Sequence, residues 1–393
     1  MPRFHVPDSN GCDFAMTEPS IRMGLPRLHK EAREVRDFLP HFVSVMAQRR
    51  IGIVLEEGYG SGMGFADGDY LEAAPEVRFV PHQEAYGQDY VLVERCPSDD
   101  ELRLMRRGAC LLSMLHFSTR PKRVELLRSL GLNAISLDSI RDDSGRRLIE
   151  NLKSVAWTGT QAAFRVLRDT YPGGRFESRE RPPIQVTLLG AGAVGMHVVQ
   201  AAVHYGDDAL RGRLIAAGVA GALVTAIDRD ITSREEIMSG ILARTDILID
   251  ATQRPDPSRH VIPNDWVAHL PQHAVILDLS VDPYDYESDP PTVRGIEGIP
   301  QGNLDQYVFP PDDPAYATLP ASVKKENRRH VVSCYSWPGV YPKECMEVYG
   351  SQLQPIVRVL AEHGGVEHIS PQGDYFERAI ARAQLSRWNG ANA

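Results

Sequence analysis

The segment Gly190-Ala191-Gly192-Ala193-Val194-Gly195 constrains the fold most, because it is a glycine-rich turn between a strand and a helix. Residues 184–189 (IQVTLL) form a short apolar run typical of a buried strand, and residues 193–205 (AVGMHVVQAAVHY) continue as a helix of small residues. In such a turn Gly190 permits the tight bend, Gly192 lets the backbone approach a pyrophosphate, and Gly195 lets the helix pack on the strand. The segment, with Ala193 and Val194 at the start of the helix, therefore predicts a dinucleotide-binding α/β domain.

An acidic residue ends the strand that should follow. Residues 222–228 (ALVTAID) form this second strand and end in Asp228. Asp228 lies much farther along the chain than the usual ~20 residues, so we interpret residues 207–221 as an inserted helix and turn. A carboxylate here would accept hydrogen bonds from ribose hydroxyls and repel a 2′-phosphate, which favours NAD, whereas the adjacent Arg229 leaves NADP possible.

Composition limits the class of protein. The 393 residues are 42% hydrophobic and 24% charged, as expected for a globular chain of two domains. The net charge of −9, without a basic stripe, argues against a nucleic-acid partner. Five cysteines without paired ligand spacing indicate a reducing compartment and no metal site. Since no apolar run approaches ~18 residues and no signal peptide is evident, we expect a cytoplasmic protein without a membrane partner.

The pattern along the chain predicts two α/β domains. Short apolar runs alternate with helical segments before the glycine-rich turn, which is typical of a parallel sheet. We predict a disordered extension over residues 1–19, a first domain over 20–147 plus 340–393, and a dinucleotide-binding domain over 148–339. The expected strands of the first domain are residues 21–25, 51–55, 77–80, 90–94, 110–117 and 132–137, and the expected helices lie near 31–49, 98–107 and 121–130. In the second domain we expect a helix at 148–167, further strands at 246–251 and 274–280, and loops with short strands to about 320. A helix over 342–363, interrupted by Pro355, could run back to the first domain.

Several segments, in their order and spacing, resemble the alanine dehydrogenase and pyridine nucleotide transhydrogenase family. They are Met23-Gly24-Leu25-Pro26, Glu34-Val35-Arg36, Met114-Leu115-His116-Phe117, the glycine-rich turn, and the run from Cys334 to Pro342 (CYSWPGVYP). Residues 138–147 (DSIRDDSGRR) and 278–282 (DLSVD) look more like the related lysine-forming saccharopine dehydrogenase. The resemblance implies two doubly wound, Rossmann-like domains with a cleft between them, the first completed by the C-terminal helix. We also expect a small amino or keto acid as substrate and a homo-oligomer.

The resemblance also implies site residues. Arg36 matches the family's carboxylate-binding arginine after a shift of one residue, and the alternative is a surface arginine of a helix. A guanidinium fork suits a carboxylate. His116 matches the catalytic histidine, whose chemistry suits proton transfer, although a histidine at a strand end is often structural. Asp282 matches an acidic position near the nicotinamide, while Asp278 could be a structural strand residue.

Arg95 is where the chain departs from the family, which carries a lysine at this position. Lysine can lose its proton when desolvated, whereas arginine keeps it, with a pKa above ~12. Arg95 could still orient a substrate carboxylate or polarise a carbonyl, leaving proton transfer to His116 or to water. We therefore expect an NAD(P)-dependent oxidoreductase acting on the C–N bond of an amino or imino acid, either an amino-acid dehydrogenase or an enzyme that condenses a keto acid with an amine. The alternative is a catalytically weakened dinucleotide-binding protein with a regulatory or scaffolding role.

Overall fold

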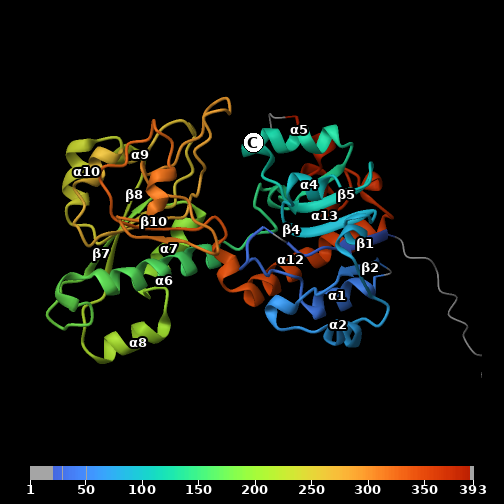
Figure 1. Cartoon of the computed structure of the whole chain (residues 1–393), viewed down its shortest axis with the longest axis horizontal. Helices are drawn as coiled ribbons and strands as arrows, with labels where there is room; N and C mark the ends of the chain where they lie inside the picture. The colour runs from blue at the N-terminus through green and yellow to red at the C-terminus, as the bar shows by residue number, and fades with distance from the viewer. Residues whose placement is uncertain (1–20, 29, 50, 390–393) are drawn as a thin grey trace, which may run out of the picture.

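The computed structural model describes residues 21–28, 30–49 and 51–389. Their strands form two six-stranded sheets, and each sheet lies in its own lobe (Figure 1). The extension predicted to be disordered, residues 1–19, lies outside the described residues. The domain limits given above stay a prediction.

The first sheet is entirely parallel, in the order β3-β2-β1-β4-β5-β6. Helices cover both faces, so its central strands are apolar throughout, and every residue of β5 is buried. This is the doubly wound arrangement that the sequence predicts. Its strands are β1 (Ile21–Leu25), β2 (Ile51–Glu56), β3 (Arg78–Val80), β4 (Tyr90–Arg95), β5 (Cys110–Met114) and β6 (Asn133–Ser136). Its helices are α1 (Pro40–Ala47), α2 (Asp67–Ala73), α3 (His82–Tyr86), α4 (Asp99–Leu102) and α5 (Pro121–Ser129).

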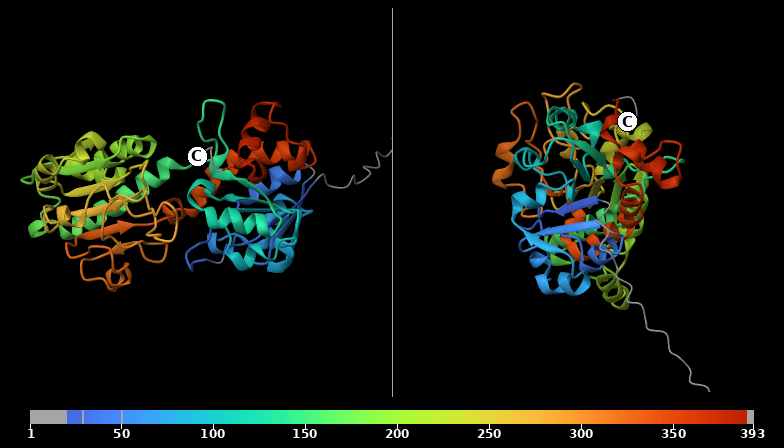
Figure 2. Two further views of the ribbon diagram at one scale, coloured as in Figure 1. Left: turned by 90° about the horizontal axis from the view of Figure 1, so that it is seen from above. Right: turned by 90° about the vertical axis from the view of Figure 1, so that its right-hand side faces the viewer.

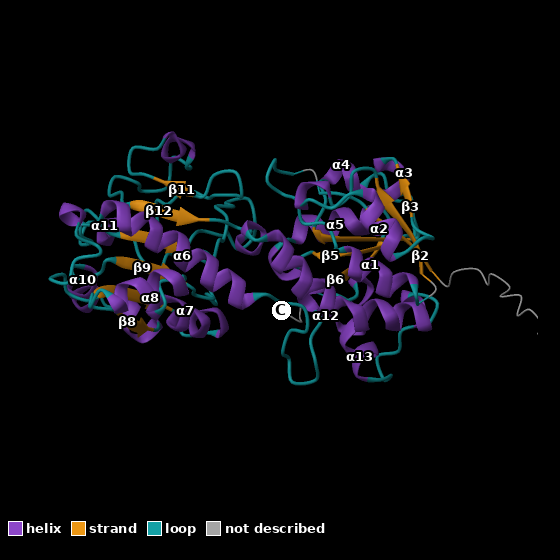
Figure 3. Cartoon of the chain, turned by 90° about the horizontal axis from the view of Figure 1, so that it is seen from below, coloured by secondary structure: helices purple, strands orange, loops and turns teal. Residues whose placement is uncertain are grey.

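The C-terminal helices complete this first lobe. Helix α12 (Pro342–Glu362) runs from the junction of the lobes along the first sheet (Figure 3), and its residues Met346, Leu353 and Leu360 are buried in the same core as β1. Helix α13 (Tyr375–Arg382) packs against α12. The predicted return of the chain to the first domain is confirmed, and α12 continues through Pro355 rather than stopping there.

The second sheet has the order β11-β12-β10-β9-β7-β8 and is parallel except for β11. An additional helix, α8, stands between α7 and β8, which confirms the inserted helix predicted within residues 207–221. The strands are β7 (Ile184–Leu189), β8 (Ala222–Ile227), β9 (Ile247–Asp250), β10 (Val275–Asp278), β11 (Val308–Phe309) and β12 (His330–Ser333). The helices are α6 (Leu152–Thr170), α7 (Ala193–Val203), α8 (Asp208–Ala216), α9 (Arg229–Thr232), α10 (Glu235–Leu242) and α11 (Asn264–Val267).

Some predicted helices are shorter than the sequence suggests. The helix expected near residues 31–49 begins only at Pro40, whose ring fits the first position of a helix. Residues 31–39 are instead irregular and carry buried charged side chains. The helix expected at 98–107 is the single turn α4.

The two lobes meet at a narrow waist, which α6 approaches from the second lobe and α12 leaves toward the first (Figure 2). The short helix η6 (Trp337–Val340) contacts both α6 and α12 there. Within the described part of the chain, no helix is both long and apolar enough to cross a bilayer.

Candidate active site

The glycine-rich turn borders a cavity of about 890 Å³, which residues of the second lobe and of the segment before α6 line together. Gly190 has φ +88°, and a Cβ on Gly195 would lie 2.2 Å from the carbonyl oxygen of Gly190, so both positions require glycine. A Cβ on Gly192 would meet nothing within 4 Å, although Gly192 lines the cavity. A side chain at Gly192 would therefore project into open space at the N-terminus of α7, where a pyrophosphate would bind.

Asp228 and Arg229 line this same cavity, together with Ala193 and Val194. Asp228 directly follows β8 and caps α9, where its Oδ1 accepts a hydrogen bond from the backbone N–H of Arg229 at 2.7 Å. Its side chain is exposed to the cavity. Six of the seven residues predicted to hold the dinucleotide thus line one cavity, whereas Gly195 is buried in the first turn of α7 and does not line it.

A second cavity of about 570 Å³ lies between the two lobes. Arg36, Arg95 and His116 line it from the first lobe, and Asp282 lines it from the second. Arg95 ends β4 and His116 follows β5, so both stand at the carboxyl ends of adjacent parallel strands, where α/β proteins commonly bind ligands. The two cavities adjoin, because Arg147, Glu150, Leu152 and Ser280 line both of them.

His116 is held in place by Asp138. Its Nδ1 lies 3.4 Å from Oδ2 of Asp138, while half of the His116 side chain, 51%, remains exposed in the cleft. Oδ1 of the same carboxylate accepts hydrogen bonds from the backbone N–H groups of Leu115 and His116, both at 3.0 Å, and from the Ser136 hydroxyl at 2.7 Å. These bonds hold His116 in a left-handed backbone conformation with φ 51°. The imidazole is therefore oriented with Nε2 as the nitrogen left for a ligand.

The environment of Asp138 keeps it ionised. Burial would raise its pKa, but the His116 side chain, the backbone N–H of His116 and the Ser136 hydroxyl stabilise the charged form and hold the pKa well below its ordinary value. Asp138 is not among the site residues predicted from the sequence. Its position near the end of β6, beside the carboxyl end of β5, is the signal that could have identified it.

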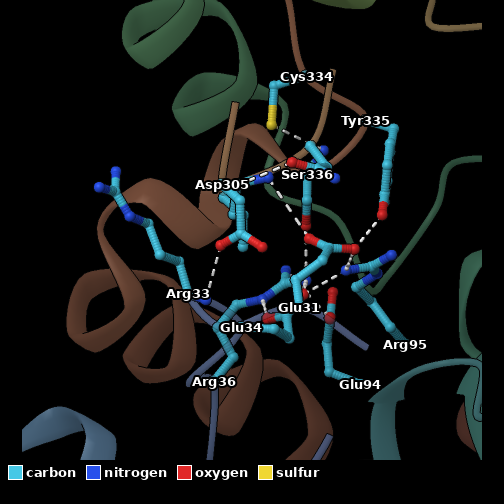
Figure 4. A network of polar contacts seen from close by, with 12 residues as sticks. Glu31, Arg33, Glu34, Arg36, Glu94, Arg95, Asp305, Cys334, Tyr335 and Ser336 are labelled. Atoms are coloured by element: carbon cyan, nitrogen blue, oxygen red, sulfur yellow. Dashed lines mark hydrogen bonds and ion pairs between the residues drawn. The ribbon is translucent and has the colours of Figure 1, made fainter. Parts of the chain in front are cut away.

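Arg36 does not have the surroundings that its predicted role requires. Its Nε and Nη2 bind the two carboxylate oxygens of Glu34 at 2.7 and 3.0 Å, and Nη2 also donates to the Ser336 hydroxyl at 2.7 Å (Figure 4). Nη1 lies 3.0 Å from Oε2 of Glu94 and contacts the Cys345 sulfur at 4.0 Å. Every nitrogen of the guanidinium thus has a protein partner, and the side chain is only 2% exposed. The predicted contact between Arg36 and a substrate carboxylate is not supported by this geometry.

The pKa values of the two glutamates around Arg36 are shifted in opposite directions. Burial would raise the pKa of Glu34, but its ion pairs with Arg36 and Arg95 lower it below the ordinary value. Burial raises the pKa of Glu94, and the nearby charge of Glu34 adds to this against the attraction of Arg36. Glu34 is therefore a counter-charge that both arginines share.

Arg95 is less completely occupied than Arg36. Its Nη1 contacts Oε1 of Glu31 at 3.3 Å and forms a close ion pair with Glu34, and its guanidinium lies over the ring of Tyr335, 4.6 Å from the centroid. Tyr335 in turn donates a hydrogen bond to Glu31. Within the described residues Nη1 is the nitrogen that both carboxylates contact, so Nε and Nη2 remain for a ligand. Arg95 is 15% exposed and faces the cleft.

The two aspartates after β10 differ in burial. Asp278 is 1% exposed, forms an ion pair with Arg294 and accepts a hydrogen bond from Ser333 at 3.1 Å, as expected for a structural residue. Asp282 is 34% exposed at the cleft, and its Oδ2 binds Arg254 at 2.7 Å. The geometry thus separates a structural Asp278 from a cleft-facing Asp282.

Comparisons with known proteins agree with this architecture. Residues 30–157 match the family model described as "Alanine dehydrogenase/PNT, N-terminal domain". The predicted resemblance to the alanine dehydrogenase and transhydrogenase family is confirmed. An alanine dehydrogenase from Mycobacterium tuberculosis (strain CDC 1551 / Oshkosh) is 22% identical over 379 residues, which cover 88% of this chain and 88% of that protein. The NAD(P) transhydrogenase subunit alpha of Haemophilus influenzae (strain ATCC 51907 / DSM 11121 / KW20 / Rd) is 23% identical over 223 residues, 55% of this chain and 40% of that protein.

The fold prediction is confirmed by a solved L-alanine dehydrogenase. It superimposes with a TM-score of 0.69 over 93% of this chain and 94% of its own, at 20% identity. At that identity the likeness establishes the fold of two Rossmann-like domains and leaves the roles of individual residues to the geometry.

Proposed function

We propose that this chain is a nicotinamide-dependent oxidoreductase that acts on the C–N bond of an amino or imino acid. The observation that carries the proposal is the junction of the two cavities at Arg147, Glu150, Leu152 and Ser280. A dinucleotide held at the glycine-rich turn would extend past this junction toward His116. The similarity to proteins named alanine dehydrogenase and NAD(P) transhydrogenase supports the same conclusion.

The residues at the turn fit a dinucleotide. Gly192 leaves the pyrophosphate path open, the N-terminus of α7 favours an anion, and the Asp228 carboxylate faces the cavity where a ribose would lie. We propose NAD as the preferred cofactor, since a 2′-phosphate would meet the negative charge of Asp228. When bound, the cofactor would supply or accept the hydride.

The cleft residues would handle the proton and the orientation of the substrate. His116 exchanges a proton through Nε2, because Asp138 fixes the other ring nitrogen. Arg95 stays protonated and orients a substrate carboxylate or carbonyl through Nε and Nη2. Arg36 acts as a positioning residue, because it holds Glu34 and thereby sets the orientation of Arg95. We propose that Asp282, which lines the cleft from the second lobe, stands near the nicotinamide.

A turnover assay tests the proposal. The purified chain, reduced cofactor, a 2-oxo acid and an amine should together consume the cofactor, and His116→Ala should lower turnover at saturating substrate. Gly192→Val should abolish cofactor binding, whereas Gly240→Val, at another exposed glycine with open space around its Cβ, should not. Cofactor binding without turnover for any combination of oxo acid and amine would instead favour the weakened, regulatory protein, which the occupied Arg36 and the arginine at position 95 also suggest.

The remaining proposals concern the oligomeric state and the cellular location of the protein. We propose a homo-oligomer in the cytoplasm. Light scattering of the purified protein would test the first statement, and fractionation of cells that express the full chain would test the second.

A further inference from the structure

The cleft cavity carries positive charge that its acidic residues do not balance. Lys30, Arg120 and Arg123 all line it. Arg120 and Arg123 donate to backbone carbonyl oxygens, of Thr119 at 2.9 Å and Leu115 at 2.8 Å. Within the described chain, none of the three cations forms an ion pair with a carboxylate, in contrast to Arg36 and Arg95, which are paired with glutamates.

Two of these cations stand where a helix makes positive charge unfavourable. Arg120 is the N-cap of α5 and Arg123 lies in its first turn, which contains no acidic residue and receives no side-chain cap. The N-terminus of a helix carries a partial positive charge from its free N–H groups. Cations are repelled there, whereas an anion would be attracted by the helix and by both side chains.

Burial adds to this imbalance. Burial is the main cause that lowers the pKa of Arg120, and the neighbouring charge of Arg123 lowers it further. Burial likewise is the main cause that lowers the pKa of Lys30, and the charges of Arg95 and Arg123 lower it further, against an opposing effect of Cys96. Keeping Lys30 and Arg120 charged in this buried environment therefore costs free energy, and an anionic ligand in the cavity would offset that cost.

The opposite wall does not supply that anion. Asp282 is bound to Arg254 at 2.7 Å. The charges of Asp282 and Asp285 raise the pKa of Arg120, but they do not overcome the lowering caused by burial and by Arg123. A competing explanation is that Arg120 and Arg123 hold the first lobe against the loop of the second lobe that contains Asp282 and Asp285.

We propose that Lys30, Arg120 and Arg123 form a subsite for a second carboxylate of the substrate, so that the chain selects a dicarboxylic 2-oxo acid over a monocarboxylic one. This inference rests on the proposed function, because it assigns the substrate class of the same cleft. Arg95 and His116 then serve the reacting end of the substrate, and the basic cluster serves its far end.

Two matched probes test the subsite. The acids 2-oxoglutarate and 2-oxopentanoate have the same carbon chain and differ in the second carboxylate. Their affinities for the full chain with bound NADH are measured by calorimetry, for the unchanged protein and for Arg120→Gln and Arg123→Gln. The control is Lys122→Gln, which removes a charge from the same helical turn. Lys122 is 68% exposed, pairs with Glu287 and does not line the cavity.

The unchanged protein and Lys122→Gln should bind 2-oxoglutarate about tenfold to a hundredfold more tightly than 2-oxopentanoate, as expected for charged hydrogen bonds. Arg120→Gln and Arg123→Gln should each lose most of that ratio while binding 2-oxopentanoate as before. An unchanged ratio in both variants would overturn the subsite. Equal weakening of both probes, reproduced by Asp285→Asn, would also overturn it and favour docking of the lobes. Failure of the chain to bind NADH contradicts the proposed function itself, whereas NADH binding with equal affinity for both probes contradicts the subsite alone.

Discussion

Substitution of Asp138 separates the structural and catalytic parts of the account. In Asp138→Ala, the backbone N–H of Leu115, the backbone N–H of His116 and the Ser136 hydroxyl lose their shared acceptor. Leu115 and Ser136 are fully buried, and each buried donor left unpaired costs about 1–3 kcal/mol. We therefore expect the free energy of unfolding to fall by about 2–4 kcal/mol.

In Asp138→Asn, the side-chain carbonyl can still accept these three bonds, and only the oxygen facing Nδ1 of His116 is replaced. Most of the stability should remain, with a loss of about 1 kcal/mol or less. The amide donates where the carboxylate accepted, so His116 loses its orientation. Turnover should fall about tenfold to a hundredfold in both variants.

Urea unfolding and steady-state kinetics of both variants provide the measurements. The pKa of Asp138 is lowered in the folded chain, so its contribution to stability is present above the ordinary carboxylate pKa of about 4 and is lost as the pH falls through the lower, folded value. The stability difference between the unchanged protein and Asp138→Asn should accordingly shrink on acidification. Turnover of Asp138→Asn equal to that of the unchanged protein would refute the role assigned to the Asp138–His116 pair.

Substitutions at three other positions have expected outcomes of their own. Asp228→Ala should relax the preference for NAD, and tighter binding of NADP than of NAD by the unchanged protein would contradict the assignment. Arg95→Ala should weaken substrate binding by about 1.5–3 kcal/mol, and unchanged affinity in this variant would remove Arg95 from the site. Arg95→Lys should recover part of the activity and add a limb to the pH profile of turnover, because lysine can titrate near neutrality. Arg36→Ala should lower the free energy of unfolding by about 3–5 kcal/mol, because Glu34 and Glu94 would stay buried without their partner. An unchanged free energy of unfolding in urea would show that these ion pairs do not stabilise the fold.

The cofactor cavity could be predicted from the sequence because its determinants are local. The turn from Gly190 to Gly195 needs only the residues before and after it, and the late position of Asp228 already indicated the extra helix α8. The substrate cleft depends on contacts between distant residues. Arg36 meets Glu94 and Ser336, which lie far along the chain, and no local pattern shows that these partners occupy its guanidinium.

The same reason explains the wrong helix prediction over residues 31–39. Alternating charged and apolar residues there resemble the surface of a helix, but Glu34, Arg36 and Asp37 are buried. Their polar partners come from β4, from the loop after β2 and from the second lobe. Tertiary ion pairs thus override the local helical pattern, and the helix begins only at Pro40.

The central claim is that this chain transfers a hydride between a nicotinamide cofactor and the carbon of a C–N bond. Transfer of deuterium from the reduced cofactor tests it most directly. The full chain is incubated with NADH that carries deuterium at the reactive carbon of the nicotinamide, with 2-oxoglutarate and with an amine, and the products are analysed by mass spectrometry. Because the two cavities adjoin at Arg147 and Ser280, we predict an amino-acid product in which deuterium stands on the carbon of the new C–N bond. A product that contains only hydrogen at that carbon, or no C–N product while the cofactor binds normally, would contradict the account.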